Sequence, residues 1–74
     1  MKTITVYGTM SCAPCKTLKK ALTDKQIPFR YWELDENYSG DVTSVPTTII
    51  HDDGNEIERI VGFNPSKIIE AYHD

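Results

Sequence analysis

The stretch TMSCAPCKTLKKAL, residues 9–22, contains both cysteines of the chain and leads directly into a helix-like pattern. Leu18 and Leu22 lie one helical turn apart, and lysines fill several of the positions around them. Pro14 suits the first turn of a helix, because the backbone N–H that proline lacks has no helical partner there. The stretch therefore predicts an amphipathic helix over residues 13–26, with the cysteine pair at its amino end.

Strand patterns stand on both sides of this helix. Residues 2–7 alternate, with Ile4 and Val6 on one side and threonine and tyrosine side chains on the other. After Pro28, which is expected to end the helix, residues 29–35 are rich in aromatic side chains and predict a second strand. This order predicts a βαβ unit with parallel strands and a right-handed crossover.

The second half of the chain predicts a hairpin and a final helix. Residues 45–51 read as a third strand, and DDGN at residues 52–55 predicts a tight turn into an antiparallel fourth strand over residues 56–61. A last helix follows, with Asn64 as its N-cap and Pro65 at its first position.

The intervening residues 36–44 carry Gly, Ser, Asn and Asp without periodicity, and predict a loop with at most one helical turn. The element order β-α-β, loop, β-β-α predicts one α/β domain over residues 1–74.

The composition is that of one small globular domain. Its 74 residues are 39% hydrophobic and 26% charged, and the net charge of −3 argues against nucleic-acid binding. No apolar run approaches the roughly 20 residues that span a membrane, and residues 1–6 do not resemble a signal peptide. We therefore expect a cytoplasmic protein, in a compartment where structural disulfides are disfavoured.

A cysteine pair with two intervening residues, at the end of a strand and the start of a helix, favours redox chemistry. Unpaired backbone N–H groups and the positive end of the helix dipole converge near Cys12 and stabilise its thiolate. Cys12 then attacks a substrate disulfide, and Cys15, one turn further on, resolves the mixed disulfide. Ala13 leaves the approach to Cys12 open, and Pro14 restricts the loop.

Three other interpretations of the pair stay open from the residues alone. A structural disulfide closing so short a loop would stabilise the chain little. A zinc half-site would need two further ligands, and only His51 and His73 are available, at spacings unlike those of zinc fingers. The third alternative is a pair of buried, inert thiols.

Four of the eight basic residues lie within ten positions directly after the cysteines: Lys16, Lys19, Lys20 and Lys25. They form the solvated face of the helix, or a positive surface that favours a thiolate and attracts an acidic partner. The two interpretations are compatible.

Val45 and Pro46 provide a second signal. Proline cannot donate to a sheet ladder, so Pro46 is expected at a sheet edge or at the first residue of a strand. On general frequencies alone, its peptide bond would be trans.

The motif CAPCK, preceded by ITVYGTMS and followed by SVPT and VGFNP, resembles the small thioredoxin-fold redoxins. These are the glutaredoxins and, more closely, the NrdH-type redoxins that reduce ribonucleotide reductase. The resemblance covers nearly the whole chain. It implies a thioredoxin-like (glutaredoxin-type) β-α-β-β-β-α three-layer core with a four-stranded mixed sheet, in which the second helix is shortened or absent.

The resemblance also implies roles for individual residues. Cys12 matches the nucleophile and Cys15 the resolving thiol, which together form a redox-active disulfide without a bound cofactor or metal. Pro46 matches a cis-proline beside the active site, and the backbone of Val45 matches the segment that pairs with an extended substrate. The other residues expected to contact the substrate or support the site are Ser11, Ala13, Pro14, Thr47, Gly62 and Phe63, with Tyr7 and Lys16 in supporting positions.

Two departures from the glutaredoxins predict weak binding of glutathione. Thr9 stands where many glutaredoxins carry a lysine, and Phe63 follows Gly62 where they place a second glycine and acidic residues. Each lost charge-assisted contact is typically worth ~1.5–3 kcal/mol. The buried acid of the thioredoxins also has no obvious counterpart on the first strand.

The favoured hypothesis is a monomeric dithiol–disulfide oxidoreductase that donates two electrons to protein disulfides, with ribonucleotide reductase the expected acceptor. A thioredoxin-reductase-like flavoprotein would recharge it. The alternatives are a glutathione-dependent glutaredoxin and a non-catalytic thioredoxin-fold binding module.

Overall fold

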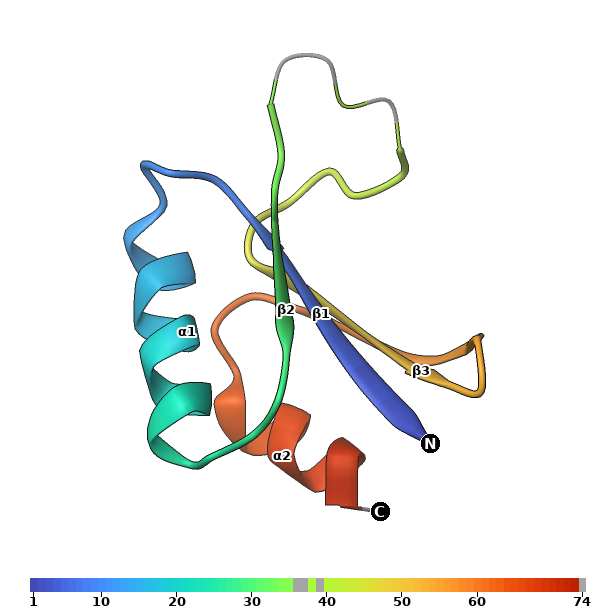
Figure 1. The fold of residues 1–74 in the computed structure, drawn as a ribbon. Coiled ribbons are helices and arrows are strands. Elements are labelled where there is room, and N and C mark those ends of the chain that lie inside the picture. Colours follow the sequence, from blue (N-terminus) through green and yellow to red (C-terminus); the bar gives the residue numbers. More distant parts are fainter. Residues whose placement is uncertain (36–37, 39, 74) are drawn as a thin grey trace.

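The computed structural model describes residues 1–35, 38 and 40–73 (Figure 1). These residues form four strands and two helices along the chain: β1 (Lys2–Gly8), α1 (Ala13–Asp24), β2 (Arg30–Glu33), β3 (Thr47–Asp52), β4 (Asn55–Val61) and α2 (Pro65–His73). Within this described part, no helix is both long and apolar enough to cross a membrane.

The strands form one mixed sheet in the order β2-β1-β3-β4. β2 runs parallel to β1, while β3 and β4 are each antiparallel to their neighbours. The expected α/β fold with a four-stranded mixed sheet is thus confirmed. The hairpin turn also lies where DDGN predicts it, with positive φ angles of 53° at Asp53 and 88° at Gly54.

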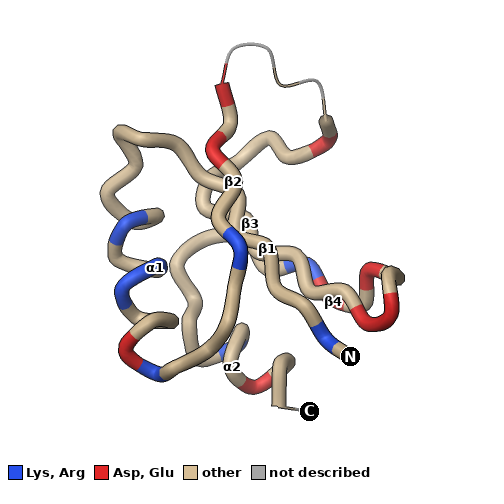
Figure 2. The backbone as a smooth tube through the Cα atoms, viewed as in Figure 1, with Lys and Arg blue, Asp and Glu red and all other residues tan. Residues whose placement is uncertain are grey.

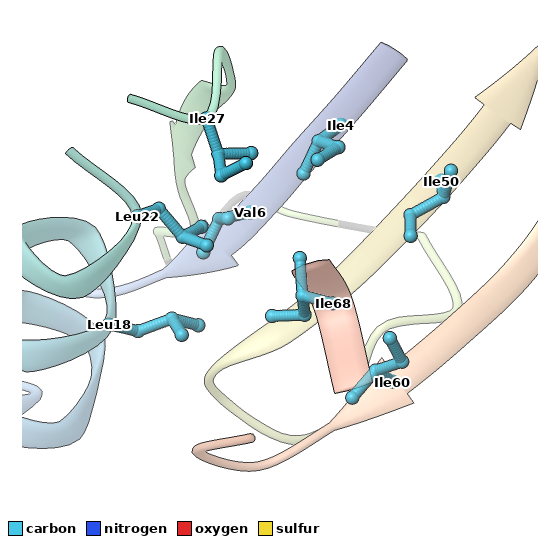
Figure 3. Packing of buried hydrophobic residues seen from close by; sticks show 8 residues of the cluster. All are labelled: Ile4, Val6, Leu18, Leu22, Ile27, Ile50, Ile60 and Ile68. Atoms are coloured by element: carbon cyan, nitrogen blue, oxygen red, sulfur yellow. The ribbon is translucent and has the colours of Figure 1, made fainter. Parts of the chain in front are cut away.

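A single apolar core lies between the sheet and the helices (Figure 3). Its buried members come from three strands, both helices and the segment after α1: Ile4, Val6, Leu18, Leu22, Ile27, Ile50, Ile60 and Ile68. Ile4 and Val6 alternate with more exposed neighbours along β1, as the sequence pattern predicts. Because α1 and α2 share this one core, they cover the same face of the sheet.

In the part of the chain that the structure describes, the opposite face of the sheet is covered by loop residues and not by a third layer of helix. No helix of the described residues lies on it; instead Val42, only 7% exposed, lines a cavity of about 90 Å³ together with Thr47 and Val61. Asp41 forms an ion pair of 3.3 Å with Arg59 of β4. The short connection between β2 and β3 thus covers this face with loop residues, where a longer chain has room for a helix.

Several element boundaries differ from those expected. α1 ends at Asp24, two residues before the expected end, because Gln26 adopts a positive φ of 59° and the chain turns before Pro28. β2 is limited to the four residues of its pairing with β1. β3 begins at Thr47, so Val45 and Pro46 precede the strand. Of the loop expected over 36–44, residues 36, 37 and 39 lie outside the described residues.

The start of α2 matches its sequence signal. Asn64 Oδ1 accepts a hydrogen bond of 3.3 Å from the backbone N–H of Lys67, and Pro65 is the first helical residue. Ile68, the buried residue of α2, is fully enclosed in the core.

Truncation of one core side chain tests this packing. We expect Leu22→Ala to lower the free energy of unfolding by about 2–5 kcal/mol, because Leu22 is fully buried. The substitution leaves a cavity, and a core this small has few side chains that could shift to fill it. The matched control is Ile57→Ala on β4, where the side chain is 48% exposed and the expected loss is under about 0.5 kcal/mol. Urea unfolding measures both, and equal losses would contradict the assigned core.

Candidate active site

Cys12 occupies the N-cap of α1. Its backbone is extended, and its Sγ accepts a hydrogen bond of 3.2 Å from the backbone N–H of Cys15. The Cys12 carbonyl in turn accepts from the N–H of Lys16 at 3.2 Å, which starts the helical pattern. Cys12 Sγ therefore lies where backbone N–H groups and the positive end of the helix favour negative charge.

Cys12 and Cys15 are joined in a disulfide, with their Cα atoms 5.2 Å apart. The two sulfurs differ in environment, since Cys12 is half-buried while Cys15 is fully buried. Cys12 is therefore the more accessible of the two residues.

In the described part of the chain, no group of three or more His, Cys, Asp and Glu side chains could hold a metal ion, so the cysteine pair has no third side chain there with which to bind zinc. His51 pairs with Thr3 near the start of β1, at the other end of the sheet from the cysteines. His73 is the last residue of α2.

Gly8, the last residue of β1, lies directly against the resolving cysteine. A Cβ atom placed on Gly8 would lie 2.8 Å from Cys15 Sγ and 3.0 Å from Cys15 Cβ, and would overlap the Tyr31 hydroxyl oxygen. Glycine at this position lets the first turn of α1 approach the strand closely. The sequence did not single out Gly8, because its packing role depends on a contact between elements.

Tyr31 is the second residue that the sequence did not single out. It pairs with Val6 in the β1–β2 register, its ring packs against the core, and its hydroxyl lies beside Gly8, on the side of that residue where Cys15 also lies. The Tyr31 hydroxyl donates a hydrogen bond of 3.3 Å to the Thr9 carbonyl. Burial first, and the Glu33 carboxylate second, raise the pKa of Tyr31 above its ordinary value.

The Val45–Pro46 peptide bond is cis, as the resemblance implied. Thr47, the next residue, pairs with Tyr7 at the end of β1 that leads to the cysteines. Gly62, which has a positive φ of 92°, donates its N–H to the Pro46 carbonyl at 2.8 Å. The proline segment and the turn after β4 are thereby joined at the edge of the sheet where the cysteine loop begins.

The remaining expected site residues differ in accessibility. Around Cys12, Ser11, Ala13, Pro14 and Lys16 are all exposed. Phe63 is 47% exposed, and Thr47 is buried with its hydroxyl donating to the Ser44 carbonyl at 2.6 Å. Half-buried Tyr7, Val45 and Gly62 complete the set.

Lysines recur along α1 and directly after its end (Figure 2). Lys16, Lys20 and Lys25 are exposed, as expected of a solvated face. Lys19 is half-buried, and its ammonium lies 4.1 Å from the centre of the Tyr31 ring. At least this lysine is therefore held close to the cysteine loop.

The fold and the disulfide at the amino end of α1 define a thioredoxin-fold protein with a Cys-x-x-Cys centre. The thioredoxin of Staphylococcus haemolyticus is 32% identical over 66 residues, covering 76% of this chain, and the match spans 64% of that protein's length. A thioredoxin of Staphylococcus aureus is 30% identical over the same extent. The chain thus spans less than two thirds of the length of these relatives, and together with the structure the matches show a thioredoxin-fold protein with a Cys-x-x-Cys disulfide.

Solved structures of thioredoxins share the fold of this chain. Mitochondrial thioredoxin 3 from Saccharomyces cerevisiae, in its oxidised form, superposes with a TM-score of 0.75 at 28% identity, covering 99% of this chain and 77% of that chain. Thioredoxin from Trypanosoma brucei brucei shares the fold with a TM-score of 0.76 at 20% identity, over 100% of this chain and 74% of that one. No family model matches the sequence.

The close contact at Gly8 can be tested by adding one methyl group. We expect Gly8→Ala to destabilise the oxidised protein by about 1–3 kcal/mol, because Cys15 and Tyr31 must both shift. Tyr31→Phe removes one of the two obstacles, so the Gly8→Ala loss should be smaller in that background. Thermal unfolding of the two single variants and the double variant forms the cycle. Additive losses would show that the two residues do not meet.

Proposed function

We propose that this protein is a dithiol–disulfide oxidoreductase that transfers two electrons to protein disulfides. The observation that carries the proposal is the Cys12–Cys15 disulfide, with an accessible sulfur at a helix N-cap and a buried partner one turn along. The cis-proline segment at the same edge of the sheet supports it.

The reduced protein would act through two exchanges. The Cys12 thiolate attacks one sulfur of a substrate disulfide, so that a Cys12–substrate bond forms and the other substrate sulfur leaves as a thiolate. Cys15 then loses its proton and attacks Cys12 Sγ, which releases the second substrate sulfur and forms the Cys12–Cys15 disulfide. Two protein thiols are oxidised and two substrate sulfurs are reduced.

We propose that the substrate binds in extended form along the cis-proline segment. The backbone of Val45 would pair with it, and Pro46 would hold it beside Cys12. The space beside Gly62 is open, since no atom lies within 4 Å of a Cβ placed on it. The exposed Phe63 side chain would offer the substrate an apolar contact. Ser11, Ala13 and Pro14 would border the approach, while buried Thr47 would fix the segment through Ser44.

A thioredoxin-reductase-like flavoprotein is the proposed electron donor and ribonucleotide reductase the proposed acceptor, in a monomeric, cytoplasmic protein. The acceptor rests on the resemblance to NrdH-type redoxins. Glutathione would be a poor donor, because Thr9 supplies no positive charge for its glycyl carboxylate and Phe63 supplies no negative charge for the amino group of its γ-glutamyl end.

Trapping distinguishes the two cysteines. We expect Cys15→Ser to accumulate mixed disulfides with substrate proteins through Cys12, because the resolving thiol is gone. Cys12→Ser is the matched control and should trap none, since Cys15 is fully buried. Non-reducing electrophoresis with mass spectrometry measures both. Trapping through Cys15 alone would reverse the assigned roles.

A coupled assay decides the electron donor. With NADPH, we expect thioredoxin reductase to sustain reduction of insulin or ribonucleotide reductase at least tenfold faster than glutathione with glutathione reductase. The inverse preference would identify a glutaredoxin. No turnover with either donor, together with thiols unreactive to alkylation, would favour a non-catalytic binding module.

A further inference from the structure

Cys15 presents a chemical problem for the proposed exchange. Its side chain is fully buried, and burial in apolar surroundings disfavours the thiolate that must attack Cys12. The side chains of β1 that face the same core are Ile4 and Val6, and neither is polar. A buried charge needs a hydrogen-bond donor nearby, so another element must supply it.

The hydroxyl of Tyr31 is a donor of this kind beside Cys15. A Cβ placed on Gly8 would meet both the Tyr31 oxygen and Cys15 Sγ, which means that the two atoms converge on the same small space beside β1. The parallel register, which pairs Tyr31 with Val6 and Glu33 with Gly8, holds the tyrosine there. Its half-buried ring packs against the core, which holds the hydroxyl beside Gly8.

We propose that Tyr31 is the positioning residue that stabilises the Cys15 thiolate, by turning its hydroxyl hydrogen from the Thr9 carbonyl to Cys15 Sγ as the mixed disulfide resolves. This inference rests on the proposed function and names the group that the resolving step uses.

The hydrogen bond that would be exchanged is a weak one. The Tyr31 hydroxyl lies 3.3 Å from the Thr9 carbonyl oxygen, whereas O–H···O bonds are typically about 2.7–2.8 Å long. A hydroxyl hydrogen rotates freely about its C–O bond, and hydrogen bonds to charged acceptors are roughly twice as strong as neutral ones. A developing thiolate at Cys15 therefore competes well for this donor.

The charges around Tyr31 agree with this role. The Lys19 ammonium lies 4.1 Å from the centre of the ring and favours negative charge nearby. Burial and Glu33 raise the pKa of Tyr31, so the phenol keeps its proton and stays a donor at neutral pH. An open pocket of about 160 Å³ lies beside Tyr31; it is lined by Thr9, Met10, Lys16, Lys19, Tyr31 and Glu33.

The resolving step then balances as follows. The Cys15 thiol gives its proton to water, and Tyr31 retains its own proton while donating a hydrogen bond to Cys15 Sγ. The Cys15–Cys12 bond forms, the bond between Cys12 and the substrate sulfur breaks, and the released substrate thiolate takes a proton from water. Cys15 sulfur is oxidised and the substrate sulfur is reduced.

The test is Tyr31→Phe, which removes only the hydroxyl. Reaction with an aromatic disulfide such as 5,5′-dithiobis(2-nitrobenzoate) releases one thiolate when Cys12 attacks and a second when Cys15 resolves, so stopped-flow absorbance separates the steps. We expect the first phase to be unchanged. The second should slow about tenfold or more at neutral pH, because the pKa of Cys15 rises by about one unit or more. At a pH above both values, the wild-type and variant rates should converge.

Tyr72→Phe is the matched control, since Tyr72 is a half-buried tyrosine of α2 packed on the same core, and both phases should match the wild type. A pH profile of the second phase that is identical in Tyr31→Phe and the wild type would overturn the proposal. Equal slowing at every pH would instead show a merely structural role and would also overturn it.

A second measurement does not depend on turnover. In Cys12→Ala, thiolate absorbance reports the pKa of Cys15 directly, and adding Tyr31→Phe should raise that pKa by about one unit or more. No shift would reject the role of Tyr31 even in a protein that exchanges normally. If the pKa of Cys15 rises in this way but thioredoxin reductase supports no turnover, the proposed electron donor is rejected and the role of Tyr31 is retained.

Discussion

The contact between Cys15 and the end of β1 is the constraint on which the site depends. Cys15 is fully buried against Gly8, where any added side-chain atom would overlap its neighbours. Because this contact fixes the first turn of α1, Cys12 remains at the N-cap, half-buried and within reach of the N–H of Cys15. The contrast between the half-buried Cys12 and the fully buried Cys15 follows from this packing.

The loop before β3 both covers one face of the sheet and leads into the cis-proline segment beside the cysteines. Asp41 and Val42 lie over the face opposite the helices, and Arg59, paired with Asp41 and Glu56, anchors this loop to β4. The hydrogen bond from Arg59 also lowers the pKa of Glu56, so the pair is charged at neutral pH. A few residues further on, the same segment forms the cis-proline turn. A short chain thus uses one loop where its longer relatives have room for a helix and a loop.

Local signals in the sequence were sufficient for the element order and for much of the site. The alternation around Ile4 and Val6, the Asp53–Gly54 turn and the Asn64 cap each act within a few residues, and each is confirmed. The end of α1 was misjudged because Gln26, not proline or glycine, takes the positive φ.

The roles of Gly8 and Tyr31 could not be predicted in the same way. Both depend on the β1–β2 register and on how closely α1 approaches the sheet, and no local pattern specifies these. An aromatic residue on a strand is most often packing, and the Tyr31 ring does pack in the core. Only the position of its hydroxyl distinguishes it from a phenylalanine.

The size of the domain gives a reason for a phenol at this place. A buried carboxylate loses its hydration on folding, and the loss must be offset by paired charge or several hydrogen bonds. A chain of 74 residues has a thin core and a small margin of stability in which to do so. A tyrosine contributes its ring to the core and exposes one neutral donor to Cys15, so it serves packing and chemistry together. Its desolvation is correspondingly less costly than that of an acid.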